Sequence, residues 1–427
     1  MITNRHLAPE FQTIEHINLP APQRFNTSKG IPVFTLPDDQ IEVLKLELIY
    51  PGGIIHQPKN LVSRFTSELI TEGTSHFNSY ELAEKIDSLG SYLFSGIDYD
   101  SSSLNLYSLS RNMGESLDIL WEVLRHAHFP EDELETLREK KKQDFQINQN
   151  KVSFLAKRAF LTALFGKNHP YGNQAEAADY DQIQRKDLVQ FFESNYHQQP
   201  IAIVLAGKIP PQIYDWLEEG LAEFPDSRNP MQELPKTPTF DASKNIHIEK
   251  EEALQTALRI GKISIDRNHP DYAGAQLLNL IYGGYFGSRL MKNIREEKAY
   301  TYGINSFFAP LKHATYWCIS TEVGTAFTND TIEQSFLELR KLQNEAVSTA
   351  ELIRVKNYWK GRIQRNLDGV FTASDQLKNL LVNDLDFDHI ERTIKTIDEI
   401  DSRQLMEIAN RHWDIDELQV VTVGKKS

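Results

Sequence analysis

The sequence predicts an α+β protein of two homologous tandem domains, each a mixed, mainly antiparallel sheet with helices packed on it. A chain of 427 residues exceeds what one hydrophobic core usually holds, and at about 100–200 residues per domain it should divide. A long repeat supports this division. Glu133 and Glu351 open matching helical stretches 218 residues apart, and Gly207 and Gly424 end matching apolar strands 217 residues apart. Two landmarks with nearly one offset indicate a duplicated unit.

The elements of the first half follow from hydrophobic periodicity. Residues 42–50 alternate in polarity and predict a strand, which ends at Pro51. Apolar residues at 61, 65 and 69 predict a helix ending before Gly73, and Ser79 is expected to cap the next helix. The remaining expected elements are a strand pair at 92–98 and 102–110, helices at 115–126 and from 131, and a closing strand at 201–207.

The second half repeats the same order. Its expected elements are strands at 258–265, 301–309, 314–322 and 419–424, and helices at 272–281, 330–344 and from 348. We expect an N-terminal domain over residues 1–225 and a C-terminal domain over 246–427. The linker between them, residues 226–245, is rich in Pro, Asp, Ser and Thr and lacks apolar periodicity.

Composition narrows the classes of function. Acidic residues outnumber basic ones by 60 to 46, giving a net charge of −14, so a general binder of nucleic acid or anionic membrane is not expected. The single cysteine, Cys318, permits no intrachain disulfide and no cysteine-based metal site, and its apolar strand predicts a buried, inert thiol. No signal-peptide pattern opens the chain and no apolar stretch could span a bilayer, so we expect a cytoplasmic protein.

The first expected helix follows the first strand of a duplicated unit, a place where a zinc-binding helix would carry ligands one turn apart on a shared face. Residues 64–68 read Arg-Phe-Thr-Ser-Glu and precede a Gly73-Thr turn. The surroundings resemble the insulinase (pitrilysin) family of zinc peptidases, in which an H-x-x-E-H helix precedes a Gly-Thr turn. The other stretches that carry this resemblance are Pro51–Gly53, Tyr80–Gly90, Phe129–Leu134, His169–Gly172 and the Gly-Lys strand ends at 207–208 and 424–425.

This resemblance implies a metallohydrolase fold like that of mitochondrial processing peptidase, but with the zinc ligands replaced. Arg64 takes the place of the first His, Ser67 that of the catalytic Glu, and Glu68 that of the second His. The third ligand, a Glu, would fall at Gln143 or Asp144. A guanidinium has no free lone pair for a metal. We therefore expect no catalytic residue, metal or cofactor in this chain, with Arg64 as a cation in the metal position and Glu68 as its partner.

The second half keeps a different part of the family pattern. Within residues 283–303, Arg295 and Tyr302 match the spacing and context of the family's substrate-binding Arg and Tyr, which lie opposite the zinc domain. A guanidinium can hold a peptide carbonyl, and a phenol can donate to the oxyanion formed when zinc-bound water attacks. The alternative is an exposed Arg at a helix end and a strand Tyr that packs.

The resemblance therefore implies a non-catalytic, substrate-binding subunit of a two-chain zinc peptidase acting on peptides or unfolded polypeptides. Its partner would be a homologous H-x-x-E-H chain that carries the zinc, and the isolated chain could form a homodimer. One alternative is a structural or scaffolding homologue without a peptidase role. Another is an autonomous hydrolase with an altered site, which Arg64 disfavours.

Two further groups of residues are weaker candidates. His126 and His128 lie near Glu131 and Glu133, but this segment is expected to be a turn between helices, so metal binding is not expected there. Asp98 and Asp100 are expected to face solvent at a strand end and not to form an acid–base pair.

Overall fold

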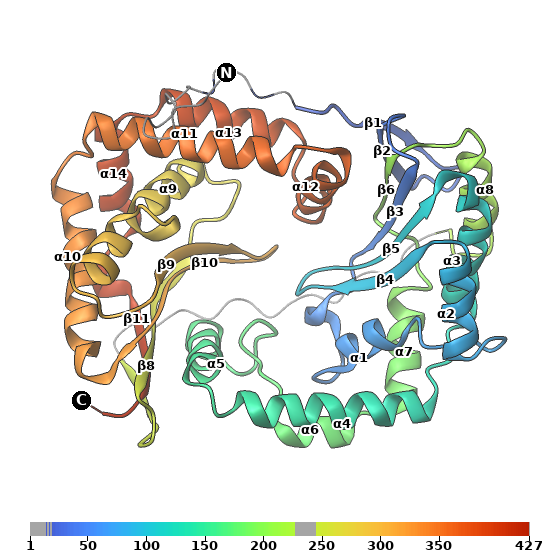
Figure 1. The fold of residues 1–427 in the computed structure, drawn as a ribbon, viewed down its shortest axis with the longest axis horizontal. Coiled ribbons are helices and arrows are strands. Elements are labelled where there is room, and N and C mark those ends of the chain that lie inside the picture. Colours follow the sequence, from blue (N-terminus) through green and yellow to red (C-terminus); the bar gives the residue numbers. More distant parts are fainter. Residues whose placement is uncertain (1–13, 15–16, 18, 227–244, 427) are drawn as a thin grey trace, which may run out of the picture.

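The computed structural model describes residues 14, 17, 19–226 and 245–426 and contains two mixed sheets (Figure 1). The first half forms a six-stranded sheet in the order β1-β2-β6-β3-β5-β4, and the second half a five-stranded sheet in the order β7-β11-β8-β10-β9. The strands are β1 (Gln23–Asn26), β2 (Pro32–Pro37), β3 (Val43–Tyr50), β4 (Tyr92–Ile97), β5 (Ser102–Leu109), β6 (Ala202–Gly207), β7 (Ile246–Glu249), β8 (Gln255–Ser264), β9 (Ile304–Pro310), β10 (Thr315–Gly324) and β11 (Gln419–Gly424).

Helices precede and follow these strands in the same order in both halves. In the first half they are η1 (Ile54–His56), α1 (Val62–Leu69), α2 (Ser79–Ser88), η2 (Ser110–Asn112), α3 (Met113–His126), α4 (Glu131–Asn148), α5 (Val152–Phe165), α6 (Ala177–Gln182), α7 (Arg185–Asn195) and α8 (Ile213–Leu221). In the second they are α9 (Tyr272–Asn279), η3 (Leu280–Gly284), η4 (Met291–Glu297), η5 (Thr325–Phe327), α10 (Thr328–Asn344), α11 (Thr349–Asn366), α12 (Val370–Val382), α13 (Asp388–Glu399), α14 (Ser402–His412) and η6 (Ile415–Glu417).

The sheet topology confirms the duplication. Strands β2-β6-β3-β5-β4 correspond one to one with β7-β11-β8-β10-β9, and β1 is an extra edge strand. In each sheet one pair is parallel, β2 with β6 and β7 with β11, and the other pairs are antiparallel. The expected α+β fold with two mixed, mainly antiparallel sheets is therefore confirmed.

Each sheet is covered on one face by helices of its own half and on the other by a helix of the opposite half. Helices α1 and α3 contact strands β4 and β5 of the first sheet, and η3 and α10 contact β9 and β10 of the second. Across the molecule, α5 lies on β8 and β11 of the second sheet, and α12 lies on β2 and β6 of the first. Figure 1 shows α5 and α12 in the middle of the molecule, between the two sheets. The two halves thus exchange one helix each.

The structure differs from the sequence expectations at several points. Asn78, not Ser79, caps α2, because its side chain accepts from the Glu81 amide and completes a capping box. The helix from Tyr272 changes to π-helical η3 after Asn279. Asp98 is exposed as expected, but the expectation for Asp100 is wrong. Asp100 is buried where the two halves meet, and its carboxylate accepts hydrogen bonds from the Tyr171 hydroxyl and, at 3.0 Å, from the Lys312 amide of the opposite half.

The division at residues 226–245 stays a prediction, because residues 227–244 lie outside the described part of the chain. The expected burial of Cys318 is confirmed, and burial raises the pKa of its thiol to about 12. Among the described residues, none of the helices combines the length and apolar character that a membrane crossing requires.

Candidate functional site

Helix α1 is amphipathic, and its two charged side chains lie on the face that points away from the core. Val62, Phe65 and Leu69 are buried in the first core, whereas Arg64 and Glu68 are exposed on the opposite side of the helix. Residues four apart on a helix share a face, so Arg64 and Glu68 point to the same side. The sequence pattern thus presents the altered zinc positions outward from the core.

The polar contacts of α1 correct one expectation. The Glu68 carboxylate does not pair with Arg64; it pairs with Lys141 of α4, at 2.7 Å between Oε2 and Nζ. Among the described residues Arg64 has no ion-pair partner. Ser67 is buried, and its hydroxyl lies 2.6 Å from that of Ser95 on β4. Ser67 therefore fastens α1 to the sheet, where it offers no general base.

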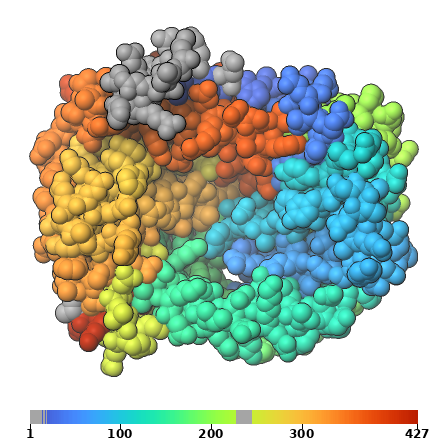
Figure 2. Space-filling model, in the orientation of Figure 1, coloured from blue at the N-terminus to red at the C-terminus, as the bar shows by residue number. Residues whose placement is uncertain are grey.

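Arg64 lines a pocket of about 380 Å³ between α1, α4 and α5. In Figure 2 the surface is hollowed where the green helices α4 and α5 meet the blue segment that contains α1. Of the two candidate positions for the family's third zinc ligand, Asp144 lines this pocket and Gln143 does not, so Asp144 is the candidate that lies near α1. The charged lining residues are four cations and one acid: Arg64, Lys141, Lys157, Arg158 and Asp144.

This set of side chains does not fit zinc. Zinc takes neutral imidazole, thiolate or carboxylate donors, and a pocket with a surplus of fixed cations repels a divalent metal. Two phenols also lie in the wall, and burial raises the pKa of Tyr99 and of Tyr180 while Arg64 opposes the rise. The phenols are neutral at physiological pH, so they supply no compensating negative charge. The pocket is suited to carboxylate or carbonyl groups.

Arg295 lies on η4 and is half-buried. Its guanidinium carbon lies 4.5 Å from the ring centroid of Phe286, a cation–π geometry, and Phe286 is 64% exposed. No acidic side chain among the described residues pairs with Arg295. Its donors are therefore available to an external acceptor.

Tyr302 combines a fixed backbone with a free side chain. The hydroxyl of Thr321 donates to the carbonyl of Gly303 at 2.9 Å, and the hydroxyl of Thr301 lies between the carbonyls of Glu322, at 2.7 Å, and Gly303, at 3.0 Å. The Tyr302 side chain is nevertheless 93% exposed. It is not a packing residue within this chain. Neither Arg295 nor Tyr302 lines the pocket at Arg64, so within one chain the structure does not bring the two sets together.

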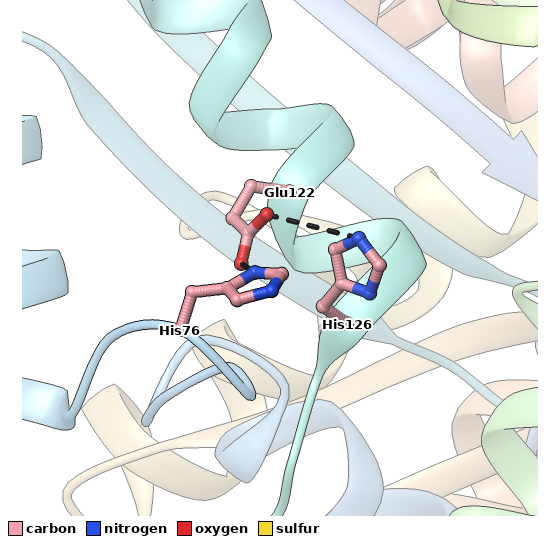
Figure 3. Close-up of side chains that lie close together, drawn as sticks. All are labelled: His76, Glu122 and His126. Carbon is pink, nitrogen blue, oxygen red and sulfur yellow. Dashed lines mark hydrogen bonds and ion pairs between the residues drawn. The ribbon is translucent and has the colours of Figure 1, made fainter.

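A third group, on α3, was only partly recognised from the sequence. His126 lies beside His76 and Glu122 (Figure 3), not with Glu131 and Glu133. His128 contacts Arg185 instead, 3.3 Å from Nδ1 to the guanidinium. The spacing of Glu122 and His126, one helical turn apart, is the signal that could have indicated this cluster.

Comparisons with known proteins match the chain to one family in two adjoining segments. Residues 40–177 match the model "Insulinase (Peptidase family M16)", and residues 182–358 match "Peptidase M16 inactive domain". A non-peptidase homologue, YmxG of Helicobacter pylori, is 20% identical over 411 residues, covering 95% of this chain and 94% of that protein. The mitochondrial-processing peptidase subunit beta of Neurospora crassa is 23% identical over 390 residues, covering 86% and 79%.

Solved structures show the same fold. The peptidase M16 inactive domain of Pseudomonas fluorescens matches with a TM-score of 0.86 at 23% identity, over 95% of this chain and 98% of that one. A chain of Complex III2 from Candida albicans matches with a TM-score of 0.72 at 16% identity, over 94% and 95%.

Proposed function

We propose that this chain, which belongs to the insulinase (M16) family of peptidases and is an inactive homologue within it, is the substrate-binding subunit of a two-chain zinc peptidase. The observation that carries the proposal is the contrast between two sets of residues. The zinc positions on α1 hold Arg64, Ser67 and Glu68, while Arg295 and Tyr302 are kept, Arg295 half-buried without an acidic partner among the described residues and Tyr302 exposed. The zinc-binding residues are lost and the substrate-binding pair is retained, which supports a division of these two roles between two chains.

In the proposed complex, a homologous chain with an intact H-x-x-E-H helix supplies zinc, water and the general base. The guanidinium of Arg295 holds the carbonyl of the scissile peptide bond. The phenol of Tyr302 donates a hydrogen bond to the oxyanion that develops on this carbonyl. The 93% exposure of Tyr302 in the single chain supports a role completed by a second chain. The substrates would be peptides or unfolded polypeptides, and a cytoplasmic location belongs to the same proposal.

The competing function is that of a scaffold without a peptidase role. The match to a chain of Complex III2 from Candida albicans favours this alternative, since that chain lies in a larger assembly. A scaffold does not require Arg295 and Tyr302 to be retained at the family's spacing. We therefore rank the substrate-binding role first.

The test is reconstitution with the zinc-bearing chain that co-purifies from the native cell. Arg295→Ala and Tyr302→Phe are each expected to lower turnover by about 100-fold or more, because loss of one oxyanion donor typically costs about 2.7–4 kcal/mol. Complex formation is measured separately by size-exclusion chromatography and should not change. Lys292→Ala, an exposed cation also on η4, and Tyr92→Phe, a 62% exposed tyrosine, are the matched controls.

Two outcomes would decide against the proposal. If both variants assemble and cleave at the wild-type rate, the pair has no role and the scaffold remains. If this chain cleaves peptides alone, and loses that activity on Glu68→Gln, the altered helix is itself a catalytic site.

A further inference from the structure

Three side chains with metal-binding donors meet at the C-terminal end of α3. His76 Nδ1 lies 2.9 Å from Glu122 Oε1, and His126 Nε2 lies 3.9 Å from Glu122 Oε2. All three ligand atoms lie within 4.8 Å of one another (Figure 3). Tetrahedral zinc with bonds of about 2.0–2.1 Å requires donors about 3.3 Å apart, so small rotations of these side chains would enclose an ion.

The backbone that carries these ligands is fixed before any metal binds. The amide of Ser75 donates to the carbonyl of His126 at 2.9 Å, and Thr74 forms an isolated β-bridge with Ala127. The loop that presents His76 is therefore hydrogen-bonded directly to the helix end that presents His126. Such preorganisation reduces the loss of conformational entropy on binding.

The charge of the cluster also favours a cation. Two imidazoles and one carboxylate give a net charge of −1 and leave a fourth position open to water. This donor set suits zinc, whereas calcium and magnesium require more oxygen ligands.

A second cluster in the described residues provides a contrast. His269, Asp271 and His412 also lie close together, but Asp271 already binds the guanidinium of Arg411 and, at 2.7 Å, the ring of His412. His269 Nδ1 accepts from the Asp271 amide at 3.1 Å. A metal would have to displace an arginine there. In the described part of the chain, no arginine or lysine pairs with Glu122 of the His76 cluster.

We propose that His76, Glu122 and His126 bind one zinc ion at the surface of the first half, separate from the pocket at Arg64. None of the three lines that pocket, and Arg295 and Tyr302 lie in the second half, so the proposed site shares no residue with the proposed peptidase role. The ion would clamp the turn that follows α1 to the end of α3.

The test uses the full chain without a polyhistidine tag, stripped with chelator and titrated with zinc chloride by calorimetry. We expect about one zinc per chain. His76→Gln, His126→Gln and Glu122→Gln should each weaken binding by at least about 100-fold, because even a lost second-shell partner costs 10–100-fold. His128→Gln, two residues beyond His126, and His412→Gln in the contrasting cluster should bind zinc as the wild type does.

Circular dichroism is used to check that each variant is folded. Elemental analysis after desalting is used to measure the zinc stoichiometry independently. The proposal is overturned if the His76 and His126 variants bind zinc like the wild type, or if the chain binds none. It is equally overturned if His412→Gln removes the ion. Glu68→Gln should leave zinc binding unchanged, which separates this site from any metal at α1.

Discussion

The two exchanged helices, α5 and α12, occupy equivalent places in the duplicated fold but are held by different interactions. Helix α5 packs on the second sheet through apolar contacts. The residues of this cluster include Phe160, Leu161, Leu164, Phe165, Cys318 and Val421. Helix α12 packs on the first sheet through a smaller apolar contact and is also held by a network of ion pairs. Helices in equivalent positions of the fold can thus be held with or without charged side chains.

The charged network joins α12 to the middle of the first sheet. Lys45 on β3 pairs with Glu47 at 3.1 Å and with Asp375 at 2.5 Å, and Lys378 pairs with Glu47 at 2.6 Å. The Lys45 and Glu47 side chains are only 2% and 1% exposed. Burying such charges costs desolvation energy, but the ion pairs outweigh it here, because the pKa of Lys45 is raised and that of Glu47 is lowered. Helix α12 is therefore held by buried ion pairs where α5 is held by packing, and four experiments test this difference.

The largest effect is expected from removing one partner of the buried network. Glu47→Ala leaves the Lys45 ammonium buried opposite only Asp375, and such a change typically destabilises by about 3–5 kcal/mol. Urea unfolding followed by circular dichroism measures the loss. Asp375→Ala, whose carboxylate is 60% exposed, serves as the control and should cost much less. An equal loss in both would contradict the importance of burial.

A smaller loss is expected at the apolar helix. Leu164 on α5 is fully buried, and Leu164→Ala should destabilise by about 2–5 kcal/mol through lost burial and the cavity left behind. Leu337→Ala on α10, where the side chain is 41% exposed, is the matched control and should stay within about 0.5 kcal/mol of the wild type. If Leu164→Ala is as mild as its control, α5 is not held by packing.

Acid should affect α12 and not α5. Burial alone would raise the pKa of Glu47, but Lys378 and Lys45 outweigh it and hold the pKa below its ordinary value of 4.5. A group with a lowered folded pKa stabilises above its unfolded pKa and loses this contribution as the pH falls through the folded pKa. The free energy of unfolding, measured from pH 6 to pH 3, should therefore fall more steeply with decreasing pH in the wild type than in Glu47→Ala. Parallel curves would show that Glu47 does not contribute.

The smallest effect is expected when both buried charges are replaced together. Lys45→Met with Glu47→Leu makes the α12 interface resemble that of α5, and such replacements are often neutral or stabilising. We expect the free energy of unfolding of this double variant to lie within about 1 kcal/mol of that of the wild type. A loss as large as that of Glu47→Ala would mean that the network stabilises the fold outright.

Local sequence signals predicted the elements and the duplication but not the long-range contacts. Periodicity within a few residues predicts the helix over residues 62–69 and the strand over 43–50. The cap of α11 is equally local, because the Ser348 side chain accepts a hydrogen bond from the amide of Glu351 in the same helix. The partner of Glu68 is Lys141 on α4. A contact between two helices depends on how the chain folds, so the pattern within α1 could not predict it. Helix α12 was not expected, since nothing local marks it as cover for the opposite sheet.

The altered site shows the same limit. The resemblance located Arg64 and the absence of zinc donors, because these depend on residue identity at aligned positions. The association of His76 with His126 depends on how the loop that carries His76 meets the end of α3, 50 positions later in the chain, and no periodicity encodes it.

The exchange of helices has a consequence for biosynthesis. The inner face of the first sheet is complete once β6 has been made, and among the described helices α12, which begins roughly 160 residues later in the chain, covers it. At about 5–20 residues per second, a ribosome needs on the order of 8–30 s to supply it. During that interval an apolar sheet face stands open to neighbouring nascent chains and to chaperones. The first half of this protein therefore cannot finish folding before most of the second half has been translated.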